Sequence, residues 1–131
     1  MNIQNQLINP DDALSLVGII TLIRARNGLK TDATLLQEIL CSARSGCIKI
    51  FYDSDETPEG YITWCEITPD TLKQIALHHV RPCYQYEWRE GHITFILDAF
   101  CPRLRNKLAL LKGIKPVAWI NAKGKLKIYG N

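Results

Sequence analysis

WREGHITFILDAFCP, residues 88–102, contains a turn at Glu90–Gly91 and then an apolar run, Ile93 to Leu97, that closes on one carboxylate, Asp98. Its β-branched and aromatic residues predict a strand. A strand that is apolar on both faces is typically buried on both faces, and a buried carboxylate is costly unless it is paired or hydrogen-bonded. Asp98 is therefore either the cap of a helix that starts at Pro102 or a functional carboxylate at the end of a central strand.

The flanking sequence divides into helical and extended segments. Helix-start signals at Asn9–Asp12, Thr31–Asp32 and Thr68–Asp70 each precede apolar residues at helical spacing, and in the first of these Leu14 and Ile20 belong to the expected buried face. We expect helices at about 10–27, 31–45, 68–80 and 102–113, and strands at 47–52, 61–67, 93–98, 116–120 and 125–129. This order, ααββαβαββ, predicts one α/β domain over residues 1–131, with a mixed five-stranded sheet and helices on both faces.

Length and composition indicate an ordinary globular domain. At 131 residues, 47% hydrophobic and 22% charged, the chain is long enough to bury a sizeable core without disulfides or metals. No apolar run approaches the roughly 18 residues of a membrane span, and the first residues lack the features of a signal peptide. The five cysteines are scattered without a CxxC spacing, which argues against a zinc site or a redox motif. We therefore expect a cytoplasmic protein without metal or cofactor.

Charge is distributed unevenly along the chain. Residues 1–102 carry eight Lys and Arg against thirteen Asp and Glu, a balance of −5, whereas residues 103–131 carry eight Lys and Arg and no acid. The basic segment is either a solvated surface or a binding site for an acidic partner. It lacks the interleaved aromatic residues of an RNA-binding sheet, so nucleic acid is the least favoured partner.

Motifs of common catalytic sites are absent from the sequence. It contains no GxGxxG, GxxxxGK[ST], GxSxG or HExxH. His78 and His79 fall on the third expected helix. His92 and Asp98 share one face of an unbroken strand, but six residues of strand span about 20 Å, so the two side chains cannot form a dyad.

The sequence resembles the toxin-activating lysine acyltransferases of the hemolysin-activator type in three segments that follow one another along the chain. These segments are Gly60–Trp64 (GYITW), Trp88-x-x-Gly91 and Phe95–Pro102 (FILDAFCP). That family has a strand ending in Ser/Thr-Trp, then Trp-x-x-Gly, then an aromatic-aliphatic strand ending in Asp. The resemblance can be threaded from about Leu16 to Gly130. It implies an acetyltransferase-like fold, which agrees with the element order.

The resemblance also implies an activity. Family members transfer a fatty acyl group from acyl carrier protein to internal lysines of a pore-forming toxin, using a histidine after the first helix and the strand-end Asp. Asp98 matches the Asp. Asn27–Lys30 (NGLK) matches the family's Ser-x-x-His, so that Lys30 stands where the histidine is expected, and the catalytic residues implied here are Asp98, Lys30 and Asn27. A lysine, with an ordinary pKa of about 10.4, cannot replace a neutral imidazole as a base unless burial lowers its pKa.

Basic residues near the C-terminus would suit the strongly acidic acyl carrier protein, or another acidic protein, as a partner; we expect this role for Arg103, Arg105, Lys107 and Lys125. Three hypotheses stay open. In the first hypothesis the chain is an acyltransferase with altered catalysis, in which Lys30 or a nearby histidine is the base and a toxin-like protein is the acceptor. In the second it is an inactive relative that binds a partner protein as a chaperone, inhibitor or antitoxin-like subunit. In the third it is an unrelated nucleic-acid- or anion-binding domain.

Overall fold

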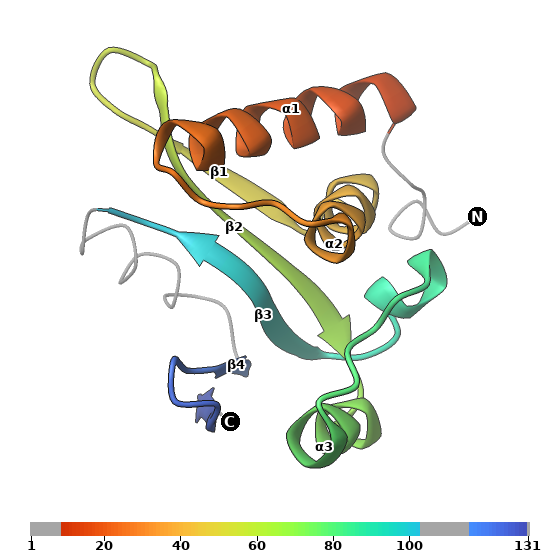
Figure 1. Ribbon diagram of the computed structural model, residues 1–131. Coiled ribbons are helices and arrows are strands. Elements are labelled where there is room, and N and C mark those ends of the chain that lie inside the picture. Colours follow the sequence, from red (N-terminus) through yellow and green to blue (C-terminus); the bar gives the residue numbers. More distant parts are fainter. Residues whose placement is uncertain (1–8, 103–115, 131) are drawn as a thin grey trace.

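The computed structural model describes residues 9–102 and 116–130 (Figure 1). Its helices and strands follow in the expected order, with one additional short 3₁₀ helix, η2. In chain order the elements are α1 (Pro10–Arg26), α2 (Ala33–Arg44), β1 (Ile48–Tyr52), β2 (Pro58–Ile67), α3 (Pro69–His78), η2 (Gln85–Trp88), β3 (Ile93–Phe100), β4 (Val117–Ile120) and β5 (Leu126–Tyr129). The greater part of the expected fourth helix, residues 103–113, lies outside the described residues.

The strands form one mixed sheet in the order β1-β2-β3-β4-β5, so β3 is the central strand, as predicted. Neighbouring strands are antiparallel except for β3 and β4, which run parallel. The parallel ladder joins Thr94 to Val117 and Phe95 to Ala118 and stops there, although β3 continues to Phe100. The mixed α/β architecture expected from the sequence is confirmed.

Helix boundaries follow from capping. The Asn9 side chain accepts a hydrogen bond from the Asp11 amide, and the Thr68 side chain does the same for Thr71. Each cap is followed by a proline, whose fixed φ suits the first helical turn. Helix α1 ends before Gly28, whose φ of +68° is accessible to glycine at little cost.

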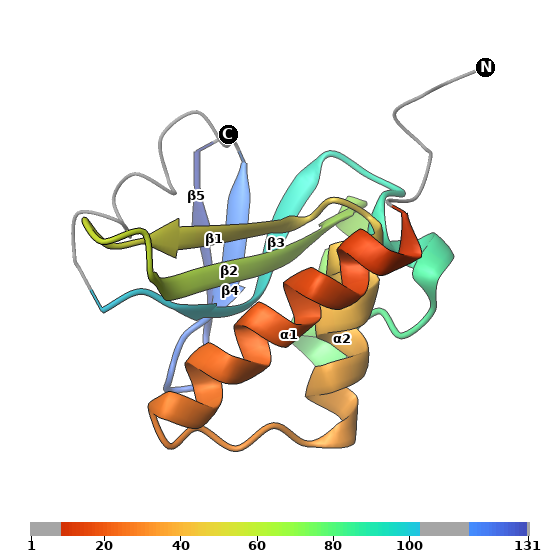
Figure 2. The ribbon, with the colours of Figure 1, turned by 90° about the horizontal axis from the view of Figure 1, so that it is seen from above.

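The first two helices lie side by side against one face of the sheet (Figure 2). Helix α1 buries Ala13, Ile20 and Ile23, whereas Leu14 is 60% exposed. The prediction that Leu14 faces the core was therefore wrong, because the buried face is rotated toward Ala13. Side chains from α2 and α3 share a core cluster, so these two helices pack on the same face of the sheet. The expectation that helices cover both faces stays a prediction, because most of the fourth expected helix lies outside the described residues.

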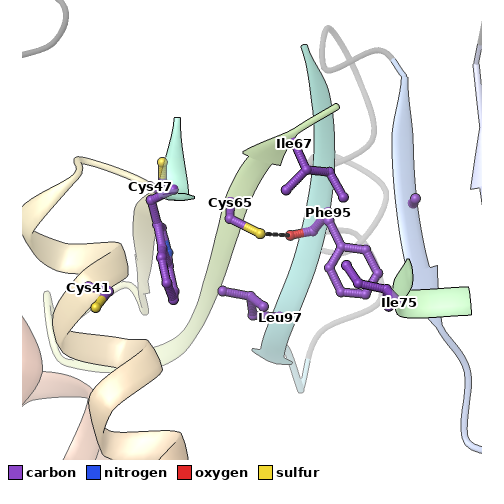
Figure 3. Close-up of a cluster of buried hydrophobic side chains, with 9 residues drawn as sticks. Cys41, Cys47, Cys65, Ile67, Ile75, Phe95 and Leu97 are labelled. Carbon is purple, nitrogen blue, oxygen red and sulfur yellow. Dashed lines mark hydrogen bonds between the residues drawn. The ribbon is translucent and has the colours of Figure 1, made fainter. Parts of the chain in front are cut away.

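The largest core cluster of the described residues joins α2 and α3 to β2 and β3 (Figure 3). Ile75 from α3 packs beside Phe95, and the Cys65 thiol donates to the Phe95 carbonyl oxygen over 3.9 Å. All five cysteines lie in the described ranges and none forms a disulfide; Cys83 is exposed and the other four are buried. Burial raises the pKa of the Cys65 thiol, so it stays protonated and packs as a small apolar side chain.

Candidate functional site

A β-bulge in β3 sets the direction of the Asp98 side chain. Trp64 pairs with Ile96 and Thr63 pairs with Asp98, which leaves Leu97 as the extra residue on β3. A bulge reverses the alternation of side chains beyond it. His92 precedes β3 and Asp98 follows the bulge, so the two residues do not share one face of an unbroken strand, contrary to the expectation. Because β3 runs on to Phe100, Asp98 is also not its last residue.

Asp98 forms a compact cluster with Arg24 and Tyr61, here called the Asp98 cluster. Asp98 Oδ2 accepts one hydrogen bond from the Tyr61 hydroxyl at 2.5 Å and another from Arg24 Nη1 at 3.1 Å. Arg24 Nη1 also donates to the Tyr61 oxygen at 2.7 Å. The side chains of Arg24 and Asp98 are 10% and 23% exposed. The pair is thus largely withdrawn from water, where charge-assisted hydrogen bonds are strong.

Arg24 is held on its remaining sides by the connection between α1 and α2. Its Nε donates to Thr31 Oγ1 at 2.9 Å, and its Nη2 donates to the Lys30 carbonyl oxygen. One guanidinium therefore links the end of α1, the loop after it, β2 and β3. This fits the planar fork of donors that distinguishes arginine from lysine.

Tyr61 is fully buried at the centre of the Asp98 cluster. Burial and the hydrogen bond to Asp98 both raise the pKa of its hydroxyl, and Arg24 only partly offsets them. The phenol consequently stays protonated and acts as a hydrogen-bond donor to the carboxylate, not as a base.

Lys30 and Asn27 lie near this cluster but contribute to it differently from the expectation. The Lys30 side chain is exposed, and the residue contacts Arg24 through its backbone carbonyl. The Asn27 side chain donates to the Ile23 carbonyl oxygen at 2.7 Å, at the end of α1. The catalytic roles expected for Asp98, Lys30 and Asn27 stay predictions, but the cation that pairs with Asp98 is Arg24.

Glu38, a buried acid on α2, lies close enough to Asp98 for the charge of Asp98 to affect its pKa. Burial raises the pKa of its carboxyl; Arg81, whose Nε is 3.3 Å from Glu38 Oε2, lowers it, and Asp98 raises it further. Arg81 Nη2 also donates to the carbonyl oxygen of Leu97, the bulge residue, at 2.6 Å. The Glu38–Arg81 pair is therefore connected through β3 to the Asp98 cluster.

Glu38 and Arg81 also line an open groove of about 470 Å³ between α2 and the segment after α3. That volume falls within the range of small-molecule and peptide-anchor pockets. His79, whose φ of +57° is left-handed, and the exposed Cys83 belong to the wall. The complete lining is Ala33, Thr34, Gln37, Glu38, His79, Arg81, Pro82, Cys83 and Trp88.

Sequence reasoning missed four residues of these two sites: Arg24, Tyr61, Glu38 and Arg81. A usable signal existed for two of them. Arg24 follows Ile20 by one helical turn, and Glu38 precedes the buried Ile39 in a helix with an apolar stripe. A charged residue on or beside such a stripe requires a partner, although its partner cannot be named from helical spacing alone.

The residues expected to bind an acidic partner are only partly described. Lys125 is exposed in the turn that leads into β5, whereas Arg103, Arg105 and Lys107 lie outside the described residues. Within residues 9–102 and 116–130, no group of three or more His, Cys, Asp and Glu side chains is arranged to hold a metal ion. No helix in those ranges is long and apolar enough to cross a membrane.

Comparison with models of known protein families found no match to this sequence, and a search of curated proteins found none either.

Proposed function

We propose that this chain is a partner-binding protein with an acyltransferase-like frame, in which Asp98 stabilises the fold and does not activate a substrate lysine. The ion pair between Arg24 and Asp98 is the observation that carries this proposal. A carboxylate that serves as a general base, or that orients one, must contact the group that gives up or receives the proton. Here Asp98 Oδ2 already accepts from a guanidinium and from a phenol whose raised pKa keeps it protonated.

The positions around Asp98 support the same conclusion. Among the described residues, no histidine forms a hydrogen bond or an ion pair with Asp98. Lys30, which replaces the family's histidine, has an exposed side chain and contacts Arg24 through its backbone carbonyl. The frame that the resemblance implies is thus combined with a structural ion pair at the position of the catalytic carboxylate.

The partner that we propose is an acidic protein. The basic C-terminal segment contains eight Lys and Arg and no acid over residues 103–131. Charge complementarity of this kind accelerates association and makes it sensitive to salt. Acyl carrier protein is the natural first probe, because the resemblance implies it as a partner.

The test separates binding from transfer. Purified chain is incubated with acyl carrier protein loaded with fatty acids of several lengths and with a lysine-containing acceptor, and acylation is followed by mass spectrometry. We expect salt-sensitive binding of the carrier by calorimetry and no transfer above the rate without the chain. Acyl transfer that is lost in Asp98→Asn, under conditions where that variant is folded, would overturn the proposal.

A second candidate is an acyltransferase with altered catalysis at the groove. The raised pKa of Glu38 is the observation that favours it, because perturbed carboxyls in open pockets often act as acids or bases. His79 lines the same groove. This candidate predicts transfer that is lost in Glu38→Gln or His79→Asn and retained in a folded Asp98→Asn variant.

A further inference from the structure

The outer side of β5 is an edge of the sheet that offers both charge and apolar surface. No described strand pairs with it beyond β4. Lys123, Lys125 and Lys127 are exposed, and so are Ile128 and Tyr129, at 56% and 45%. Within the described ranges these lysines form no ion pair. Edge strands with exposed apolar residues are templates for another strand.

The register of the terminal hairpin identifies the backbone groups that a new strand would use. The Asn121 amide donates to the Lys125 carbonyl oxygen, and Trp119 pairs with Lys127 two residues farther along. Hydrogen-bonded and non-hydrogen-bonded pairs alternate in an antiparallel ladder. The amides of Leu126 and Ile128 therefore point away from β4, toward the open edge.

Side-chain alternation along β5 defines the partner's chemistry. Lys125 and Lys127 fall on one face of the strand, and Leu126 and Ile128 fall on the other. An added strand places its side chains directly beside those of its neighbour. The complementary segment is extended, with acidic side chains on one face and apolar side chains on the other.

We propose that β5 binds such an alternating acidic-apolar segment of a partner protein by strand addition. The inference rests on the proposed function, because it specifies how the partner binds. A second copy of β5 is a poor occupant, since lysines would face lysines. The opposite edge, β1, is also unsuitable for an acidic segment, because the turn after it carries Asp53, Asp55 and Glu56.

The experiment uses a synthetic peptide in which valine and glutamate alternate, and a control peptide of the same composition in scrambled order. Binding is measured by calorimetry, and amide hydrogen exchange of the full chain is followed by NMR. We expect the alternating peptide to bind at least about tenfold more tightly than the scrambled one. We also expect it to slow exchange at Leu126 and Ile128, which simple electrostatic adsorption would not do.

Two lysine variants provide the matched comparison. Lys127→Glu should weaken binding of the alternating peptide about tenfold. Lys49→Glu makes the same charge change on an exposed lysine of the opposite edge strand and should leave binding within about twofold. Equal binding of the two peptides, unchanged exchange at Leu126 and Ile128, or equal losses in both variants would overturn the inference.

These outcomes are independent of acyl transfer. Detection of transfer with intact strand addition would reject the proposed function and leave the β5 site standing. Binding of acyl carrier protein without protection of the β5 amides would reject the β5 site alone.

Discussion

Arg24 and Asp98 lie 74 positions apart in the sequence, yet Arg24 Nη1 is 3.1 Å from Asp98 Oδ2. The contact fastens the last turn of α1 to the central strand, and Tyr61 on β2 completes it from the neighbouring strand. A bulge at Leu97 makes the contact geometrically accessible. The pair consequently reports on the packing of helices against sheet as much as on any chemistry at Asp98.

Replacement of Arg24 by methionine should lower the free energy of unfolding by about 3 kcal/mol, because the Asp98 carboxylate would lose its cation in a mostly buried place. Urea denaturation followed by circular dichroism measures this change. Arg26→Met is the control: Arg26 is exposed, although it donates to the Pro58 carbonyl, and its loss should have an effect of about 1 kcal/mol or less. Similar losses in the two variants would contradict a special role for Arg24.

Tyr61→Phe should reduce stability by about 1–2 kcal/mol near neutral pH, because it removes the hydroxyl between Arg24 and Asp98. Its pH dependence is more specific. The unfolded chain releases the tyrosine proton near pH ~10, whereas the raised pKa of Tyr61 keeps that proton in the folded state. Wild-type stability therefore falls as pH rises above ~10. A Tyr61→Phe variant with the same alkaline loss in urea midpoints would show that Tyr61 titrates normally.

The contribution of Glu38 to stability should fall as pH rises, whereas a carboxyl whose pKa is lowered in the folded state adds stability as pH rises. Its pKa is raised above 4.5 by burial, so between 4.5 and that higher value the folded state holds a proton that the unfolded state has lost. Wild-type stability relative to Glu38→Gln should therefore decrease as pH rises through this window. NMR titration of the Glu38 carboxyl carbon gives its pKa directly. Asp98→Asn should lower that pKa because it removes a neighbouring negative charge; an unchanged value would separate Glu38 from the Asp98 cluster.

Two glycines should respond to alanine in opposite directions. A Cβ at Gly91 would lie 2.0 Å from the Ile67 carbonyl oxygen, a backbone atom that cannot move aside, so Gly91→Ala should cost at least about 2 kcal/mol. A Cβ at Gly18, exposed inside α1, meets nothing within 4 Å. Gly18→Ala should stabilise the chain by about 0.5–1 kcal/mol. Thermal unfolding of the two variants measures both signs, and a stable Gly91→Ala variant would contradict the tight turn before β3.

Helices and strands whose boundaries depend on neighbouring residues were predicted well from the sequence. Caps at Asn9 and Thr68, each followed by proline, placed the starts of α1 and α3. The apolar run from Ile93 predicted the central strand, and its Phe95 and Leu97 side chains are buried. The expected turn between β4 and β5 also follows from local residues, Asn121 to Gly124.

The site was less predictable because its contacts join distant segments. The bulge at Leu97 depends on the register with β2, which no pattern within β3 reveals. Arg24 is a basic residue in the last turn of α1, a common place for one, yet the fold turns it inward to Asp98. Lys30 likewise contacts the cluster through its backbone carbonyl and not through its ammonium group, which its position in the motif does not reveal.

A double-mutant cycle between Arg24→Met and Asp98→Asn tests most directly the claim that Asp98 is the partner of a structural ion pair. Each single change should destabilise the chain, and the double variant should be more stable than the sum of the two losses predicts, with a coupling free energy of about 2 kcal/mol. Strictly additive losses, together with acyl transfer that depends on Asp98 in the same preparations, would contradict the account.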